Sequence, residues 1–275
     1  MGISAVLIGQ TNRTYFDAAS REESSVINDA PRFWNGAISH RYSTPELWAD
    51  FVYMAPPFLA YYAVATKNDT LLRLAIEQCM LYRQILQSNI SEPFTGLWEH
   101  IIGPEDFQPQ LWSTGNAWAA AGMTRVLATT KKWDHSSSWA YEQGCLTQWI
   151  KEILDGAIHS RQISVDPSTG LLRNVLNETT WFGETSGTAL LSSVVYRMAV
   201  LAPGLFSRES SYIEWAEKSR KATGLHVRVD GILSPAINPL DWGNHTPYTT
   251  GSPEGESFGV LLAAAYRDWV HFLSA

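Results

Sequence analysis

The 275-residue chain is poor in cysteine, in basic residues and in long apolar runs. Its two cysteines, Cys79 and Cys145, are compatible with one disulfide or with two buried thiols, and the sequence leaves both possibilities open. Twenty Lys and Arg residues stand against 27 Asp and Glu residues, and the basic ones are scattered. This argues against a nucleic acid or an anionic membrane surface as the partner. The longest apolar stretch, residues 54–65, is interrupted by two prolines and is too short to cross a bilayer. Small molecules and carbohydrates remain as open ligand classes.

Motifs for metals and common cofactors are also missing. No cluster of His, Asp and Glu has the spacing of metal ligands, and the sequence contains no P-loop, no dinucleotide-binding fingerprint and no G-x-S-x-G elbow. We therefore expect neither a metal nor a cofactor. Apolar residues make up 45% of the chain and charged residues 17%, so it can bury a substantial core. We expect residues 1–275 to form a single domain.

The clearest pattern that is present is an internal repeat. Four short segments, "FWNGAISH", "FTGLWEH", "STGLLRN" and "VDGILSP", each follow a long helical pattern. Their glycines, Gly36, Gly96, Gly170 and Gly231, are 60, 74 and 61 residues apart. A recurrence at this period is typical of proteins built from repeated structural units, and it predicts a short glycine turn after each unit.

Two kinds of helix are predicted between these turns. Segments of small and apolar residues predict inner helices that begin near Glu46, Gly115, Thr185 and Glu254. Amphipathic segments such as residues 69–87 predict outer helices with one polar face. Such pairs pack as helical hairpins, and a closed ring of hairpins is an all-α fold called the α/α toroid. The starts of the inner helices would then gather at one mouth of the ring, where we expect the site.

One inner segment, "ELWADFVYM", contains a carboxylate among apolar residues. Its pattern predicts a helix that begins at Glu46, with Asp50 beside Trp48, Phe51 and Met54. Apolar surroundings favour the protonated form of a carboxyl group, which is the form that a general acid needs. The alternative is that Asp50 only caps the helix or forms an ion pair near its start.

Five motifs in order, spread from about Arg32 to the C-terminus, resemble one known family. It is that of the unsaturated rhamnogalacturonyl hydrolases, glycoside hydrolase family 105, in particular their fungal branch, and it is related to the unsaturated glucuronyl hydrolases of family 88. The motifs are "WADFVYMAPPFLAYYAVATKND", "TGLWEH", "WSTGNAW", "ETSGTALL" and "SPEGESF…AAYRDW". The resemblance implies a six-hairpin α/α toroid. Since only about four hairpins can be found, we expect the domain to be N-terminally incomplete and to lack its first hairpins.

The resemblance also implies a reaction. The family acts on oligosaccharides left by pectin lyases, whose terminal uronic acid carries a C4–C5 double bond. An acid protonates C4, water adds at C5, and the resulting hemiketal opens and releases the rest of the chain. Asp50 matches the catalytic Asp in the family pattern W-x-D-x-x-x-M, so the resemblance implies that Asp50 is the proton donor.

The substrate-binding candidates come from the same comparison. His100 matches a family active-site histidine, and His40 holds the same place in the preceding repeat. Trp112 and Trp118 offer aromatic planes on which a sugar could stack. Thr114 stands where many bacterial relatives have an Arg that is thought to contact the uronate. The remaining candidates, all near predicted starts of inner helices, are Trp48, Asn116 and Ser186.

Two other hypotheses stay open. Another α/α-toroid glycosidase or a polysaccharide lyase would need a second carboxylate facing Asp50, for which Glu254 is the candidate. A non-catalytic or truncated carbohydrate-binding pseudoenzyme would agree with the missing hairpins and with Thr114.

The compartment is indicated by potential glycan acceptors. Five asparagines precede a Ser or Thr at the second following position, which favours a secreted eukaryotic glycoprotein. They are Asn12, Asn68, Asn89, Asn177 and Asn244. The first residues, "MGISAVLIGQ", lack the basic start and the length of a signal peptide, so a cytoplasmic location stays open. The sequence does not indicate an oligomeric state.

Overall fold

The structure is a computed structural model that describes residues 2–133, 136–238, 240–241 and 243–274. The elements in chain order are α1 (Gly2–Gly9), α2 (Arg13–Asn28), β1 (Leu47–Trp48), α3 (Phe51–Thr66), α4 (Asp69–Leu86), β2 (Ile101–Ile102), β3 (Phe107–Gln108), α5 (Ser113–Lys132), η1 (Ser136–Trp139), α6 (Ala140–His159), α7 (Arg161–Ser164), α8 (Thr185–Leu201), α9 (Ser211–Leu225) and α10 (Pro253–Ser274). The prediction of an all-α chain is confirmed.

The chain divides into two compact units. The first consists of Met1–Gln87, Glu99–Pro109 and Gly122–Ile150. The second consists of Ser88–Trp98, Gln110–Ala121 and Lys151–Ala275.

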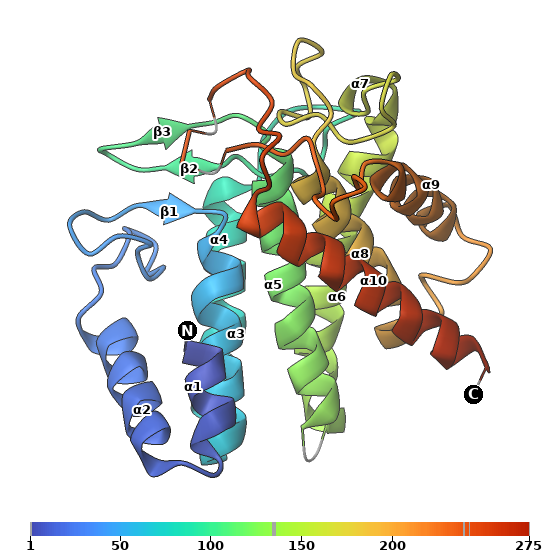
Figure 1. Ribbon diagram of the computed structural model, residues 1–275. Coiled ribbons are helices and arrows are strands. Elements are labelled where there is room, and N and C mark those ends of the chain that lie inside the picture. The colour runs from blue at the N-terminus through green and yellow to red at the C-terminus, as the bar shows by residue number, and fades with distance from the viewer. Residues whose placement is uncertain (1, 134–135, 239, 242, 275) are drawn as a thin grey trace. The chain divides into compact units, whose positions relative to one another are not determined.

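The first unit is built on helix pairs. α1 packs against α2 and α3, and α3 packs against α4. α4 buries the stripe of residues between Leu71 and Leu86 and exposes Arg73 and Glu77, as expected for an outer helix. The strands form a small antiparallel sheet in the order β1-β2-β3, and it lies at the end of the unit where α3 begins (Figure 1). This sheet holds the segment that contains Asp50.

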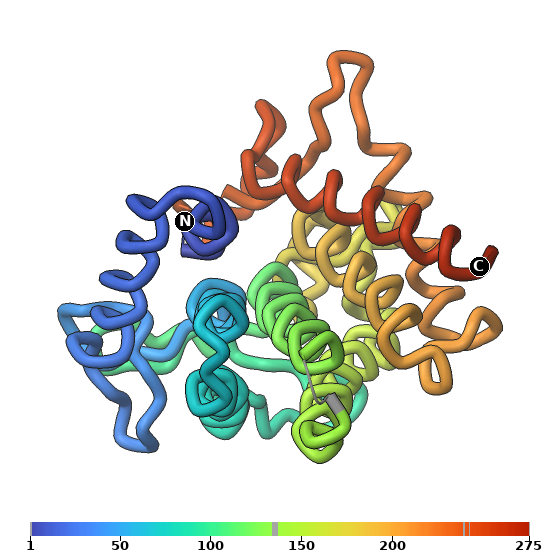
Figure 2. Tube along the Cα trace, turned by 90° about the horizontal axis from the view of Figure 1, so that it is seen from below, coloured from blue at the N-terminus to red at the C-terminus, as the bar shows by residue number. Residues whose placement is uncertain are grey.

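In the second unit, α8 is the central helix. It contacts both α9 and α10 (Figure 2), and residues 185–196 are buried without interruption. A helix that is covered on all sides can be apolar or small all round, because none of its faces meets water. The predicted inner character of this segment is confirmed.

The four glycines of the repeat occupy backbone conformations that other residues rarely adopt. Gly36, Gly96, Gly170 and Gly231 have φ values of 92°, 96°, 73° and 87°. A positive φ brings the Cβ of an L-residue into steric conflict, so glycine is the residue that closes such turns at least cost. The predicted glycine turns are therefore confirmed.

Three of the predicted inner helices begin within two residues of the expected position. α5 begins at Ser113, α8 at Thr185 and α10 at Pro253.

The predicted helix start at Glu46 was wrong, because α3 begins only at Phe51. Residues 47–48 form β1 instead, and Trp48 pairs there with Ile101 of β2. Ladder hydrogen bonds to a distant segment satisfy these backbone groups, and no local periodicity signals them.

The cysteines are two free thiols, so the disulfide left open by the sequence is not formed. Cys79 is buried, and burial raises the pKa of its thiol well above the usual value. Cys145 is half-buried.

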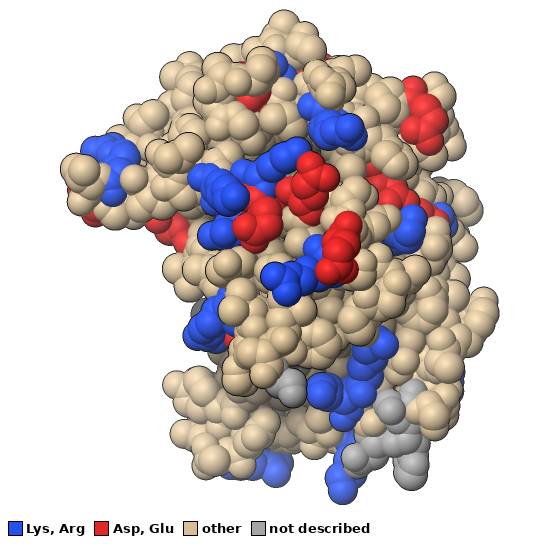
Figure 3. Space-filling view, turned by 90° about the vertical axis from the view of Figure 1, so that its right-hand side faces the viewer, with Lys and Arg blue, Asp and Glu red and all other residues tan. Residues whose placement is uncertain are grey.

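Acidic and basic side chains are interspersed on the face shown in Figure 3. Ion pairs of the second unit include Lys218 Nζ to Glu214 Oε1 at 2.6 Å and Arg197 Nη1 to Asp268 Oδ2 at 2.5 Å. Among the described residues, no helix combines the length and apolar character needed to cross a membrane.

Candidate active site

Asp50 lies directly before α3, but its side chain does not cap that helix. Its backbone is helical, and the carboxylate makes no capping hydrogen bond. The side chain is 17% exposed. Its Oδ2 is buried and accepts no hydrogen bond from the described residues. The capping role that the sequence left open is therefore excluded, but the other alternative, a pairing near the helix start, is present, with Asp50 Oδ2 at 3.2 Å from His100 Nε2.

The small sheet brings His100 to Asp50. Trp48 of β1 pairs with Ile101 of β2, and the Ala49 N–H donates to the His100 carbonyl at 2.9 Å. His100 Nε2 then lies 3.2 Å from Asp50 Oδ2, with the His100 side chain only 2% exposed. A carboxylate and an imidazole at this distance can exchange or share a proton.

His40 and Trp48 complete the cluster. Their rings stack with centroids 4.8 Å apart and an interplanar angle of 11°, and the Trp48 ring meets His100 edge-on at 5.8 Å. Burial lowers the pKa of His40, the negative charges of Asp50 and Glu46 oppose this shift, and the positive charge of Arg41 adds to it. His40 Nδ1 is buried without a hydrogen-bond partner in the described part of the chain. His40 therefore favours the neutral form.

Aromatic residues wall the cluster on the side of α3 and α4. The ring of Phe51 stacks on Tyr82 at 4.8 Å, and Phe51 is 6% exposed. The Tyr82 hydroxyl donates to the Ile38 carbonyl at 2.7 Å. Burial, together with the charge of Asp50, raises the pKa of Tyr82 well above its usual value. Met54, which was expected to shield Asp50 as well, is 46% exposed. Trp48 and Phe51, the other two apolar neighbours in the sequence, are buried.

Sequence reasoning missed a buried acid in this cluster. Glu46 is fully buried, and its Oε1 accepts from the N–H groups of Glu105 and Asp106 at 3.0 and 2.6 Å. Its Oε2 accepts from Trp48 Nε1 at 3.1 Å and lies 3.3 Å from Arg41 Nε. Glu46 thus joins the turn before β3 to the residues beside Asp50. The only sequence signal was an acid two residues before Trp48.

The other predicted site residues lie in the second unit. Trp112 is 3% exposed, and its Nε1 donates to Asn174 Oδ1 at 2.8 Å. The Asn116 amide donates to the carbonyls of Trp98 and Trp112 and accepts from the Trp98 N–H at 2.8 Å. Trp118 is half-buried and meets Phe258 edge-on. Sugar binding by Trp112, Asn116 and Trp118 stays a prediction.

Glu184 organises the remaining two candidates. It is fully buried and caps α8 through the N–H groups of Ser186 and Gly187, at 2.8 and 2.6 Å. It also accepts from the hydroxyls of Ser113, Thr114 and Ser186. Glu184 is therefore the N-cap of α8. Thr114 and Ser186 are both fully buried, and their contact with substrate stays a prediction.

The same backbone hydrogen bond recurs after three of the repeat glycines. The residue four positions after the glycine accepts, through its carbonyl oxygen, an N–H from the residues at the start of an earlier inner helix. The pairs are His100 with Ala49, Asn174 with Ser113, and Pro235 with Thr185, at 2.9, 2.8 and 2.9 Å. His40 and Asn174 occupy the same repeat position as His100. Asn174 was missed, although this spacing could have identified it.

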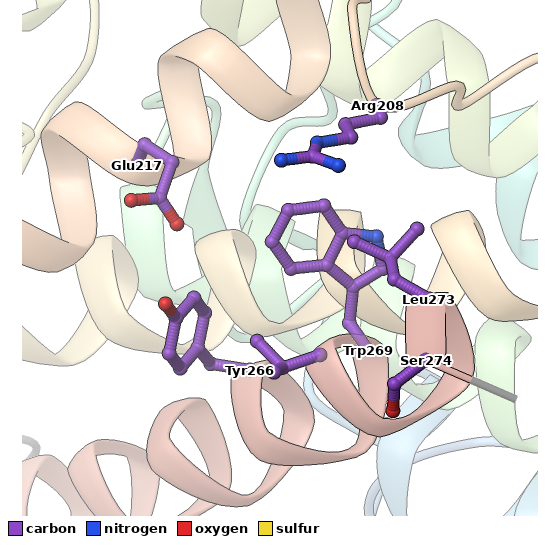
Figure 4. A pocket seen from close by; sticks show the side chains of 7 residues that line it. Arg208, Glu217, Tyr266, Trp269, Leu273 and Ser274 are labelled. Carbon is purple, nitrogen blue, oxygen red and sulfur yellow. The ribbon is translucent and has the colours of Figure 1, made fainter.

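A cavity of about 370 Å³ in the second unit is less suited to catalysis (Figure 4). Its acid, Glu217, already accepts hydrogen bonds from Tyr196 and Arg220. Its tryptophan, Trp269, is only 7% exposed. Glu254, the candidate second carboxylate, is half-buried in the first turn of α10. Among the described residues, no group of three or more His, Cys, Asp or Glu side chains could hold a metal ion.

Helical hairpins with buried inner helices, joined through glycine turns, are the architecture of the α/α toroid. The chain belongs to glycosyl hydrolase family 88, whose family model matches residues 3–238. It is therefore a member of a glycosidase family. No curated protein matches the chain.

Solved structures agree on the fold. A possible member of family 105 from Salmonella enterica has a TM-score of 0.81 at 20% identity, over 98% of this chain and 70% of its own. A family 105 glycoside hydrolase from C. acetobutylicum has a TM-score of 0.79 at 15% identity, over 97% and 78%. The unsaturated glucuronyl hydrolase of Bacillus sp. GL1 has a TM-score of 0.66 at 14% identity, over 97% and 72%. The chain shares the α/α-toroid fold of these hydrolases.

Proposed function

We propose that the chain removes a terminal 4,5-unsaturated uronic acid from oligosaccharides by hydrating its double bond. Its natural substrates would be rhamnogalacturonan-type fragments left by pectin lyases. The observation that carries the proposal is the Asp50 carboxylate, which stands at a helix start without capping it and lies 3.2 Å from His100. A carboxylate that caps no helix and whose contact is a titratable imidazole is available for chemistry.

The proposed roles follow from the geometry. Asp50 donates a proton to C4 of the unsaturated ring, and a water adds at C5. The carboxylate then takes a proton from that water, so one group acts as acid and as base. His100 orients the carboxylate or the water, because its Nε2 reaches Asp50 Oδ2. Trp48 and Phe51 keep bulk water from one side of the carboxylate.

An ordinary two-carboxylate glycosidase is less well supported by the first unit. Such enzymes need a second carboxyl group that can reach the sugar or a water. Glu46 is the other acid in the cluster, but it is fully buried and engaged by two backbone N–H groups, an indole N–H and Arg41. It cannot exchange those partners for a substrate without leaving buried donors unsatisfied.

The decisive test compares two matched oligosaccharides, one ending in an unsaturated uronate and the other in the saturated sugar. Hydration removes the ultraviolet absorbance of the conjugated double bond, so turnover is followed directly. The proposal expects loss of absorbance with the first substrate and no product from the second. Cleavage of both at similar rates would favour an ordinary glycosidase, and binding without turnover would favour a pseudoenzyme.

Secretion is part of the proposal and rests on the sequons. Asn12, Asn68, Asn89 and Asn244 are exposed, whereas Asn177 is half-buried. Protein produced in a secreting eukaryotic host should lose apparent mass on treatment with an N-glycosidase. An unchanged mass would remove this support.

A further inference from the structure

A cation is a strong partner for a uronate carboxylate, and the expected position does not supply one. Thr114 stands where many bacterial relatives have an Arg. It is fully buried and donates its hydroxyl to Glu184 at 3.3 Å. It brings no positive charge to a ligand. If the proposed function is correct, a cation that pairs with the carboxylate of the uronate has to come from another position.

Arg41 is a basic side chain that contacts the Asp50 cluster. Its guanidinium carbon lies 4.6 Å from the centroid of the Trp48 ring, and its Nε lies 3.3 Å from Glu46 Oε2. The side chain is 42% exposed. In the described part of the chain, no acceptor hydrogen-bonds its two terminal Nη groups. The Nε of Arg41 is therefore held by Glu46, and its Nη groups can donate hydrogen bonds to a ligand.

Glu46 holds Arg41 at its Nε only. Its charge is shared among two backbone N–H groups, the Trp48 indole and Arg41. The main chain adds a second restraint, since the Ser39 hydroxyl lies 2.9 Å from the Glu46 N–H and 3.1 Å from the Arg41 N–H and accepts from both. The His40 N–H donates to the Glu46 carbonyl at 2.8 Å. These bonds fix the segment that carries Arg41.

We infer that the Glu46–Arg41 pair is a carboxylate receptor, in which Glu46 presets Arg41 and the Nη groups of Arg41 bind the carboxylate of the uronate. This inference rests on the proposed function for its natural ligand. A guanidinium presents paired N–H donors that match the two oxygens of a carboxylate. Stacking on Trp48 and pairing with Glu46 reduce the side-chain freedom that binding would otherwise remove. Arg41 is the binding residue, and Glu46 is a positioning residue.

The test measures charge discrimination and does not depend on turnover. Calorimetry measures the binding of a uronate-terminated disaccharide and of its methyl ester. Saturated disaccharides are measured with the wild type. Unsaturated disaccharides are measured with Asp50→Asn, so that they are not turned over. Arg41→Gln should weaken binding of the free acid about 10- to 100-fold, the range of a charge-assisted hydrogen bond, and should leave the ester unchanged. Glu46→Gln should lower the preference for acid over ester about 2- to 10-fold, because Arg41 is then no longer held in place before the ligand binds.

A matched control is available in the same unit. Arg73 pairs with Glu142 at 2.5 Å and lies 4.4 Å over the Trp139 ring, so it repeats the ion pair and the stacking outside the cluster. Arg73→Gln should keep the full preference for the acid.

Each outcome decides a separate point. A preference for the acid that survives in Arg41→Gln, or that falls equally in Arg73→Gln, overturns the receptor. Equal losses for acid and ester in Glu46→Gln overturn its positioning role, because a purely structural defect does not distinguish the two ligands. A wild type that prefers the acid through Arg41 but does not hydrate the double bond overturns the proposed function alone.

Discussion

Replacing Asp50 with Asn keeps the shape of the side chain and removes its acid. Loss of a general acid lowers a rate by roughly 10²- to 10⁴-fold, which corresponds to about 3–5 kcal/mol of barrier. The structure also predicts what will not change. Asp50 caps nothing, and its Oδ2 accepts no hydrogen bond from the described residues, so the substitution changes only the pairing with His100. The free energy of unfolding should therefore stay within about 1 kcal/mol of the wild type.

The assay has two readouts on the same samples. Absorbance loss with an unsaturated substrate gives kcat and KM, and urea unfolding gives the stability. Asp17→Asn is the matched control, since Asp17 forms an exposed ion pair with Arg13 on α2 of the same unit. It should leave both the rate and, within about 0.5 kcal/mol, the stability unchanged.

Two results would refute this reasoning. A near-normal rate in Asp50→Asn would remove Asp50 from the chemistry. A lost rate accompanied by several kcal/mol of lost stability would show that the carboxylate supports the fold.

The remaining predictions concern the scaffold and pH. Gly96→Ala should cost more stability than Gly36→Ala, measured by urea unfolding: both glycines have positive φ, but a Cβ at Gly96 would approach a backbone oxygen to 2.3 Å, whereas at Gly36 the nearest atom is 4.0 Å away. We expect about 1 kcal/mol for Gly36 and at least twice that for Gly96. Glu184→Ala should cost about 3–5 kcal/mol by the same measurement, because it leaves several buried donors without an acceptor. The pKa of His40 is lowered on folding, so the unfolded state binds its proton at a higher pH, and stability should fall as the pH drops below about 6.5. His40→Gln should flatten this acid limb in urea titrations at pH 7.5 and 5.

Opposite outcomes would be informative. Equal losses at the two glycines would mean that strain in φ dominates over the close contact. A Glu184→Ala protein of near-normal stability would mean that water satisfies the donors. An unchanged acid limb in His40→Gln would assign the pH dependence to other groups.

The sequence predicted the features that depend on local chemistry. Positive φ requires glycine, so Gly36, Gly96, Gly170 and Gly231 were recognisable as turns. A helix with no polar face must be covered on all sides, so α8 was recognisable as an inner helix. Of the site, His40, Trp48, Asp50 and His100 were predicted, and the structure brings them together in the first unit.

The features that were missed depend on distant partners. β1 is only two residues long, and its pairing with β2 leaves no periodic pattern. The acceptor Glu184 and its donor Ser113 are 71 residues apart, so the bond between them could not be read locally. Glu46 was assigned to a helix start, because nothing in the sequence indicates that the turn before β3 donates two N–H groups to it.

The hydrogen bond that joins one repeat to an earlier one is formed by main-chain atoms, so the side chain at the same residue is free to serve another role. Four residues after Gly96, Gly170 and Gly231, the carbonyl of His100, Asn174 or Pro235 accepts the N–H that joins one repeat to an earlier one. The side chain at this position takes no part in that bond. Even proline serves there, since the position has to supply only an acceptor. Evolution can therefore exchange side chains at this position while the ring keeps its geometry. For protein engineering, a library at His100 would leave the main-chain bond to Ala49 in place, whereas a library at Asn174 would also remove the acceptor of the buried Trp112 indole.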